Sequence, residues 1–320
     1  MNPNSKKKIW SLILKMPNHR KSINPAIKWS GSKRKIAPII ADMLPACTHY
    51  YEPFVGSGAM LPFRTSRTGV AGDVIGELVE LWKMIRDKPE LTADEYGKRW
   101  NRLQSEGHTA YYDIRDSFNA NRDAHDFLFL TRTCVNGLIR FNRAREFNNS
   151  LHHTRPGISP SSLRKIIYQW SRITQGIDFI TSDYRETLAS TGIDDLVFLD
   201  PPYGGTKGRY IPDEFDLDEF YMELERLNDI GAKWVLTFDG EAGNRSYNTH
   251  IPPELYKTKL SLATGNSPFT KLMRTGIDKV LESVYLNFEP SYELSGQTMD
   301  FGENGTDATA TLDMQLRFPC

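Results

Sequence analysis

The hydrophobic and polar positions of this chain alternate in blocks that predict an α/β protein. Short apolar runs, such as residues 196–199, have the length of buried strands, and the stretches between them have helical periodicity. Continuous apolar runs are typical of parallel strands that are covered on both faces. The other predicted strands begin near residue 50 and span residues 69–73, 177–181, 234–238, 256–262 and 280–287. The helices predicted between them begin near residue 33 and after residue 58, and span residues 76–85 and 217–229.

The alternation is interrupted between residues 88 and 174, where helical periodicity dominates. Predicted helices over residues 93–104, 111–118, 123–134 and 161–174 surround a long irregular segment, residues 136–160. Irregular segments of that length are usually functional or disordered. We therefore predict a domain formed by residues 25–87 and 175–288, with a mostly helical insert at residues 88–174. A basic, flexible extension (1–24) and a mobile acidic tail (289–320) are expected to flank it.

Charge is distributed unevenly, although the net charge of the 320 residues is zero. Residues 132–172 contain eight Lys or Arg and one acid, and residues 1–21 contain six Lys or Arg and no acid. The last 32 residues, 289–320, contain six acids and one Arg. This segregation predicts a basic face that could bind nucleic acid. A solvated helix face would produce the same pattern.

Cysteine usage and hydropathy predict a cytoplasmic protein. Cys47, Cys134 and Cys320 are far apart and have no metal-binding spacing, so we expect a reducing compartment and no metal. The apolar run at residues 9–14 is too short to cross a membrane and is followed by Lys15. No membrane association is therefore expected.

The predicted strand at 196–199 ends in Asp200-Pro201-Pro202-Tyr203. Neither proline has an N–H, and each biases its predecessor towards extended geometry, so the strand cannot continue. An acid, a rigid carbonyl and an aromatic ring are thus held at the carboxyl end of a strand, where open α/β sheets have their active sites. An incidental Pro-Pro loop is the alternative interpretation.

Two glycine-containing segments near the amino terminus predict a cofactor site. One runs from Trp29 to Lys33, and the other, Phe54-Val-Gly56-Ser-Gly58, follows a predicted strand. The second fails as a dinucleotide fingerprint, because a leucine occupies the position of the third glycine. Asp73 ends the next predicted strand, where an acid either accepts hydrogen bonds from a ribose or caps a helix.

Together these motifs resemble the Dam-like, adenine-specific DNA methyltransferases over about residues 26–288. The quoted residues are Asp-Pro-Pro-Tyr (200–203), Lys-Trp-Ser-Gly-Ser-Lys (28–33), Phe-Val-Gly-Ser-Gly (54–58) and the segment 131–142 with Glu-Phe-Asn (146–148). The resemblance implies a Rossmann-like, S-adenosylmethionine-dependent methyltransferase sheet with an inserted, mostly helical target-recognition domain. It also implies methyl transfer to the exocyclic amine of a flipped adenine in duplex DNA.

The resemblance assigns roles to particular residues. Asp200, Pro201, Pro202 and Tyr203 are implied to be catalytic, with Tyr203 stacking on the flipped base. Asp183, at the end of another predicted strand, is implied to lie near the cofactor adenine, and a structural cap is an equal alternative. The residues implied to bind the cofactor are Trp29, Lys33, Phe54, Gly56, Gly58, Asp73, Asp183 and Asp200.

The segment from Thr131 to Asn148 looks like the family's target-recognition hairpin. Arg and Asn side chains can pair bidentately with guanine and adenine edges, although others hold phosphates. The sequence departs from the family pattern at Arg145, where glycine is usual. The expected DNA-binding residues are Arg132, Asn136, Arg140, Asn142, Arg143 and Arg155.

Other functions stay open at this point. Methylation of the cytosine amine is chemically close, although Asp200 favours adenine. A catalytically inactive DNA-binding relative is another alternative, which the presence of all the expected site residues disfavours. Methylation of RNA or of protein glutamine would more often use Asn-Pro-Pro-Tyr. A NAD-linked dehydrogenase is disfavoured because the third glycine of the dinucleotide-binding fingerprint is missing. Expected partners are double-stranded DNA and, as a candidate, a cognate restriction endonuclease. We expect a monomer.

Overall fold

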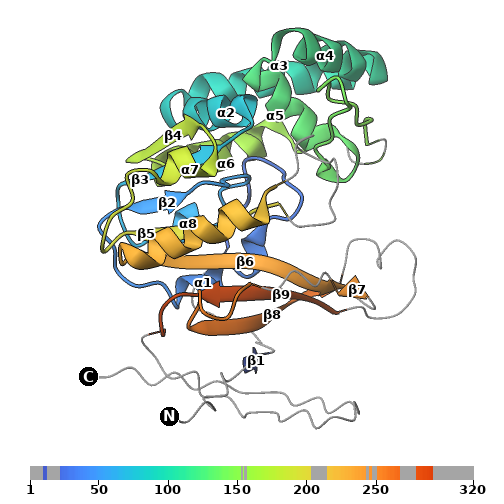
Figure 1. Ribbon diagram of the computed structural model, residues 1–320. Coiled ribbons are helices and arrows are strands. Elements are labelled where there is room, and N and C mark those ends of the chain that lie inside the picture. Colours follow the sequence, from blue (N-terminus) through green and yellow to red (C-terminus); the bar gives the residue numbers. More distant parts are fainter. Residues whose placement is uncertain are drawn as a thin grey trace, which may run out of the picture.

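The computed structural model of the chain describes residues 10–12, 22–152, 154, 157–202, 215–242, 245–246, 251–266 and 279–290 (Figure 1). It is a three-layer arrangement in which helices cover both faces of one large sheet. Within these residues the sheet has nine strands, eight of them in the order β1-β8-β9-β6-β5-β2-β3-β4, and β7 pairs with β6. The strands are β1 (Trp10–Leu12), β2 (Tyr50–Glu52), β3 (Gly69–Asp73), β4 (Ile177–Thr181), β5 (Leu196–Leu199), β6 (Lys233–Ala242), β7 (Arg245–Ser246), β8 (Thr258–Asn266) and β9 (Lys279–Leu286).

The strand order creates a switch point between β2 and β5. Strands β6, β5, β2, β3 and β4 are parallel to one another, whereas β9 is antiparallel to both β6 and β8. The chain runs outward from β2 through β3 to β4, and then returns to the other side of β2 to form β5 and β6. Open α/β sheets bind ligands beyond the carboxyl ends of the strands at such a reversal.

The alternation of side chains along β5 explains why both faces are covered. Leu196 and Phe198 join one buried hydrophobic cluster, and Val197 and Leu199 join another. All four side chains are at most 2% exposed, as expected for a strand between two helical layers. Helices that pack around the sheet include α1 (Ala37–Ala41), α2 (Gly76–Asp87), α7 (Tyr184–Leu188) and α8 (Leu217–Asp229).

Between β3 and β4 the chain adds a group of helices that lies at the top of Figure 1. Their buried residues, among them Phe127 and Leu163, belong to the same core cluster as Tyr50 of β2. Trp82 of α2 lies at the junction, stacked on Phe179 at a ring distance of 5.7 Å. The helices of this group are α3 (Pro89–Glu106), α4 (His108–Asn121), α5 (Ala124–Thr133), the 3-10 turn η3 (Val135–Gly137) and α6 (Pro160–Ile173).

Three segments differ from the sequence-based expectation. The helix expected after Gly58 is only the 3-10 turn η2 (Leu61–Phe63), because β3 already begins at Gly69 and leaves no room for a longer helix. The helix expected near Lys33 is split into the 3-10 turn η1 (Lys33–Lys35) and α1, which has a proline in its first turn. Within residues 1–24, which were predicted to be flexible, β1 pairs in parallel with β8.

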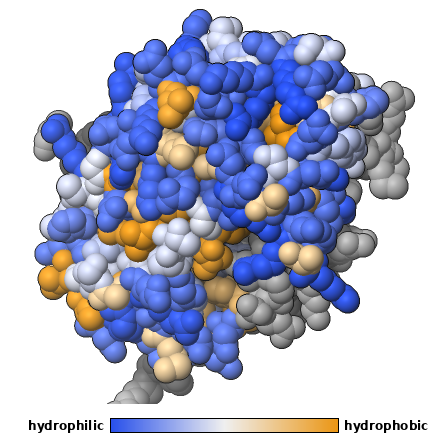
Figure 2. All heavy atoms as spheres, turned by 90° about the horizontal axis from the view of Figure 1, so that it is seen from above, coloured by the Kyte–Doolittle hydropathy of each residue, from blue (hydrophilic) through white to orange (hydrophobic). Residues whose placement is uncertain are grey.

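Seen from the side of the inserted helices, the surface is mainly hydrophilic (Figure 2). Hydrophobic atoms are confined to separate small patches on this face. Isolated apolar residues of this kind are normal for a protein surface. Among the helices that the structure describes, none combines the length and the apolar character that a membrane span needs.

Candidate active site

The candidate site lies at the switch point, where β2 and β5 end side by side. Asp200 follows β5, and its Oδ1 is 3.0 Å from the ammonium of Lys33. The hydroxyl of Thr237, on the neighbouring strand β6, donates to the same oxygen at 2.8 Å. Glu282 of β9 is 3.5 Å from the Lys33 ammonium. We call Lys33, Asp200, Thr237 and Glu282 the switch-point corner.

Lys33 is the central charge of this corner. The residue is only 3% exposed, and its ammonium also donates to the carbonyl oxygen of Gly31 at 3.1 Å. A buried ammonium needs such partners, because burial without them is costly and removing one leaves an uncompensated charge. The contacts therefore tie the segment that carries Trp29 and Lys33 to the end of β5.

The glycine loop after β2 lies next to Trp29. Gly56 and Gly58 have φ angles of +44° and +63°, in the left-handed region that favours glycine. A Cβ at Gly56 would lie 3.1 Å from the Trp29 indole, and one at Gly58 would lie 2.9 Å from Leu61. The Gly56 carbonyl accepts a hydrogen bond of 3.0 Å from the Trp82 indole. The sequence therefore needs glycine at both positions for local geometry alone.

Asp73 lies beside this loop at the end of β3. Its carboxylate accepts hydrogen bonds from the backbone N–H of Gly56 at 3.2 Å and of Ile75 at 3.1 Å. The carboxyl is partly buried, which raises its pKa to about 6 despite these bonds. Helix α2 has Ile75 as its N-cap, so Asp73 is not the capping residue of that helix.

Asp183 and Phe54 lie at the same edge in different surroundings. Asp183 is the N-cap of α7, and its carboxylate accepts from the backbone N–H and the guanidinium of Arg185, at 3.0 and 2.7 Å. These contacts correspond to the capping alternative. The Phe54 ring stacks on Tyr184 at 5.6 Å and contacts Phe215 edge-on at 6.0 Å.

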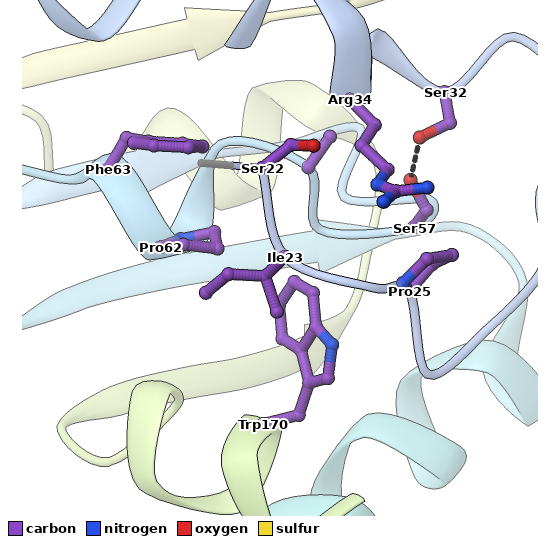
Figure 3. A pocket seen from close by; sticks show the side chains of 10 residues that line it. Ser22, Ile23, Pro25, Ser32, Arg34, Ser57, Pro62, Phe63 and Trp170 are labelled. Carbon is purple, nitrogen blue, oxygen red and sulfur yellow. Dashed lines mark hydrogen bonds between the residues drawn. The ribbon is translucent and has the colours of Figure 1, made fainter. Parts of the chain in front are cut away.

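A small pocket borders the glycine loop and is lined by Ser22, Ser32, Arg34, Ser57 and Trp170, among others (Figure 3). Inside it, the hydroxyls of Ser32 and Ser57 are 2.7 Å apart and join the Trp29–Lys33 segment to the loop. None of the predicted site residues lines this pocket, so we assign it a structural role.

The expected recognition segment forms a short hairpin, residues 141–147, which we call the recognition hairpin. Phe141 and Phe147 form an isolated antiparallel bridge, and the N–H of Asn142 donates to the carbonyl of Glu146 at 2.9 Å. The φ angle of Arg145 is +61°. This angle explains why glycine is usual at the position, and the arginine here adopts a conformation that glycine adopts without strain.

The side chains predicted to bind DNA fall into two groups. Asn136, Arg140 and Arg143 are exposed, although the guanidinium of Arg140 donates to Asn148 at 2.8 Å. Asn142 is half-buried, and its amide donates to the Glu146 carboxylate at 2.8 Å.

Arg132 behaves differently from the exposed residues. Its guanidinium donates to the carbonyl oxygens of Pro25, at 2.9 Å, and of Ala26, at 3.5 Å. Its Nε is buried and has no partner among the described residues. Arg132 thus holds the segment that leads to Trp29, and its position favours a structural role over contact with a base.

Two predicted residues, Tyr203 and Arg155, lie outside the described residues, as does most of the glycine-rich loop after the tetrad. Pro201 is buried and Pro202 is half-buried. The predicted acidic tail also lies outside, apart from its first two residues.

Sequence reasoning missed three polar residues near the corner. Glu52 is 2% exposed, accepts a hydrogen bond of 2.9 Å from the Tyr50 hydroxyl, and has a pKa raised to about 8 by burial. Thr237 and Glu282 are polar residues inside apolar strand patterns, and this feature of the sequence could have indicated a functional role. Their contacts depend on strand register, which the sequence pattern does not specify.

Comparison with known proteins agrees with the motifs. The family model described as D12 class N6 adenine-specific DNA methyltransferase matches residues 29–248, which include Trp29 and Asp200. Because the match covers more than half of the chain, the chain belongs to this family. It is an adenine-specific DNA methyltransferase, as the resemblance implied, and the family favours adenine over the cytosine amine.

Named relatives support the same conclusion. The retron Ec67 DNA adenine methylase of Escherichia coli is 31% identical over 246 residues, which cover 74% of this chain and 84% of that protein. The type II methyltransferase M.MjaIII of Methanocaldococcus jannaschii is 26% identical over 268 residues, 73% of this chain and 88% of that protein. A DNA adenine methylase of Vibrio cholerae is 29% identical over 182 residues, 55% of this chain and 64% of that protein.

Proposed function

We propose that this methyltransferase takes the methyl group from S-adenosylmethionine and transfers it to the exocyclic amine of an adenine flipped out of duplex DNA. The observation that carries the proposal is the 3.0 Å contact between Lys33 and Asp200 at the switch point. It brings the predicted cofactor motif and the predicted catalytic tetrad to one place, where α/β sheets bind ligands.

Asp200 is proposed to activate the target amine. The lone pair of an adenine amine is delocalised into the ring, so the nitrogen is a poor nucleophile. Hydrogen bonds donated by the amine to the Asp200 carboxylate and to the Pro201 carbonyl favour tetrahedral geometry and free the lone pair. Tyr203 would stack on the flipped ring, an interaction worth about 1–3 kcal/mol. Positioning of the two reactants supplies much of the rate.

The residues near the glycine loop fit a nucleoside cofactor. The Trp29 indole packs against Gly56, so an aromatic ring lies directly beside the glycine loop, where it could contact a bound nucleoside. Asp73, at the end of β3, would accept hydrogen bonds from ribose hydroxyls. When bound, S-adenosylmethionine supplies an electrophilic methyl on sulfonium. Lys33 and Phe54 would line the same site, and Asp183 is a weaker candidate because Arg185 occupies its carboxylate.

Recognition of the DNA site is proposed to rest on the insert and its exposed polar side chains. Arg140 and Arg143 project from the recognition hairpin or its base, and Asn136 lies in the neighbouring 3-10 turn. Arginine and asparagine pair with guanine and adenine edges in the major groove. We assign Asn142 and Arg132 to supporting the hairpin and the Trp29 segment, because both are engaged with the protein.

We further propose that the enzyme acts as a monomer in the cytoplasm, where its DNA substrate lies. The similarity to a type II methyltransferase makes a cognate restriction endonuclease a candidate partner. Size measurement of the purified chain tests the monomer, and nuclease challenge of methylated host DNA tests the partner.

The proposal is tested by incubating the purified chain with methyl-labelled S-adenosylmethionine and unmethylated duplex DNA. Digestion to nucleosides should yield labelled N6-methyl-2′-deoxyadenosine, and sequencing of the methylated DNA should map the modification to one short site. Labelled N4-methyl-2′-deoxycytidine would instead identify the cytosine amine as the target. Binding of DNA without any transfer would identify an inactive relative and overturn the proposal.

A further inference from the structure

From the contacts of Thr237 we infer that this residue positions the catalytic carboxylate of Asp200. The inference rests on the proposed function, in which Asp200 accepts a hydrogen bond from the adenine amine. Thr237 lies on β6, next to β5, and the parallel pairing of these strands ends at Leu199 and Leu236. Thr237 is therefore the first residue of β6 beyond the pairing, opposite Asp200.

The geometry of Thr237 is specific for the carboxylate. Its Oγ1 is 2.8 Å from Asp200 Oδ1 and 3.3 Å from the carbonyl oxygen of Leu199. A hydroxyl has one hydrogen to donate, and the nearer, charged acceptor forms the stronger bond. Thr237 is fully buried, and its β-branched side chain has few accessible rotamers, so the hydroxyl is held in place before any ligand arrives.

Two donors of different kinds converge on the same oxygen. The Lys33 ammonium is 3.0 Å from Asp200 Oδ1, and Thr237 approaches it from another strand. Two donors from different directions fix the rotation of a carboxylate about its Cβ–Cγ bond better than one does. The orientation of the carboxylate decides whether it meets the target amine, and a displacement of about 1 Å can lower a rate about a hundredfold.

The backbone around Thr237 supports this placement. Thr237 pairs with Val284 of β9, and the register between β6 and β9 shifts between Thr237 and Gly240. Such an irregularity bends a strand and redirects its side chains, and it is common next to active sites. Thr237 is thus the last residue of the regular ladder between β6 and β9, and its backbone is held there by its pairing with Val284.

The matched variants are Thr237→Val, which keeps the shape and removes the hydroxyl, and Thr237→Ser, which keeps the hydroxyl. Thr258→Val is the control. Thr258 is 7% exposed, and its hydroxyl also lies near a carbonyl and a carboxylate, at 3.1 Å from Phe288 O and 3.1 Å from Glu289 Oε2. It is the first residue of β8 and pairs with Leu286, at the amino end of the parallel strands.

The measurement is the single-turnover rate of methyl transfer at saturating S-adenosylmethionine and duplex DNA, together with the Kd for S-adenosylmethionine. We expect Thr237→Val to lower the rate about tenfold to a hundredfold while the Kd changes less than about threefold. Thr237→Ser should recover most of the rate, and Thr258→Val should keep the wild-type rate.

A wild-type rate in Thr237→Val overturns the inference, as does an equal loss in Thr237→Val and Thr237→Ser, which would identify a packing role. If Thr237→Val does not fold, Thr237→Ser and Thr237→Ala provide the comparison: equal rates in this pair overturn the inference, and a faster Ser variant supports it. An inactive wild-type protein would instead reject the proposed function, so the two failures are distinguishable.

Discussion

Charged side chains differ in burial between the switch-point corner and the recognition hairpin. Lys33 is buried and pairs with Asp200 and Glu282 from two different strands. Arg140 and Arg143 are exposed on one short segment near residues 141–147. Buried, paired charges have one geometry before a ligand arrives, whereas exposed ones gain theirs from the ligand.

The difference in burial fits a different function for each region. A reaction needs a preorganised site, because misplaced groups lower its rate. Reading a DNA sequence needs side chains that can reach base edges and displace water, which exposure allows. Substitutions in the corner should therefore change the rate, and substitutions on the hairpin should change the choice of site.

The largest effect is expected for Asp200→Ala. Loss of the acceptor for the amine should lower methyl transfer to less than about one thousandth of wild type, since electrostatic groups of this kind contribute strongly. The Kd for S-adenosylmethionine should stay within about tenfold, because Trp29, Gly56 and Asp73 remain. Both are measured on the purified chain, with the exposed Asp178 of β4 as the control substitution, Asp178→Ala. Equal losses of binding and transfer would show that Asp200 mainly holds the cofactor.

The next effect distinguishes exposed from buried arginines. Arg140→Ala or Arg143→Ala should reduce discrimination between the preferred site and its single-base variants by about 1–3 kcal/mol, as a lost bidentate contact would. The readout is the methylation rate on a panel of duplexes. Unchanged preference in both variants would remove the hairpin from recognition.

Arg132→Ala tests the opposite case, an arginine whose contacts are internal. Its contacts with Pro25 and Ala26 are internal, so we expect the free energy of unfolding to fall by about 1.5–3 kcal/mol with the order of preferred sites unchanged. Denaturant titration measures the first quantity, and the same duplex panel measures the second. A relaxed preference at wild-type stability would return Arg132 to the DNA-contacting residues.

Glu52 predicts a pH effect of intermediate size. Burial raises the pKa of its carboxyl from 4.5 to about 8, so the stability associated with the proton is fully present below pH 4.5 and is lost as the pH rises through 8. Glu52→Gln keeps a carbonyl acceptor for the Tyr50 hydroxyl and removes this titration. The Tm of wild type should fall relative to that of the variant between pH 5 and 9, by a few degrees. Parallel Tm curves over this range would contradict the assignment.

The smallest effect is expected for Arg145→Gly. At a φ angle of +61°, glycine relieves a strain of about 1 kcal/mol, so the variant should be slightly more stable in denaturant titration. The bond from the Arg122 guanidinium to the Arg145 carbonyl, 2.6 Å long, is preserved because it uses the backbone. Arg143→Gly, without a positive φ, is the control and should not be stabilised. A loss of stability in Arg145→Gly would mean that the arginine side chain outweighs the strain.

Sequence patterns predicted the central strands best. The bounds of β3, β4 and β5 agree with the predicted strands at residues 69–73, 177–181 and 196–199, and β5 is buried along its whole length. The prediction of a helix after Gly58 was wrong, because the hydrophobic pattern does not show how short the segment before the next strand is.

The site was predictable to the extent that it is local in sequence. Asp200, Pro201 and Pro202 directly follow β5, and the glycine loop directly follows β2, as the strands predicted before them indicated. Thr237 and Glu282 were not, because their partners lie 37 and 249 positions away and are brought close only by strand order. Arg132 was predicted to bind DNA from its charge, and charge alone does not distinguish a DNA contact from the internal contacts that its guanidinium forms with Pro25 and Ala26.

The position of β9 has a consequence for synthesis. This strand is the last of the sheet in sequence, yet it lies in the interior of the sheet, between β6 and β8. A chain still emerging from the ribosome therefore has a gap between two earlier strands until about residue 286 has left the exit tunnel. Since Glu282 lies on that strand, the buried lysine gains its second counter-ion only after β9 has left the tunnel.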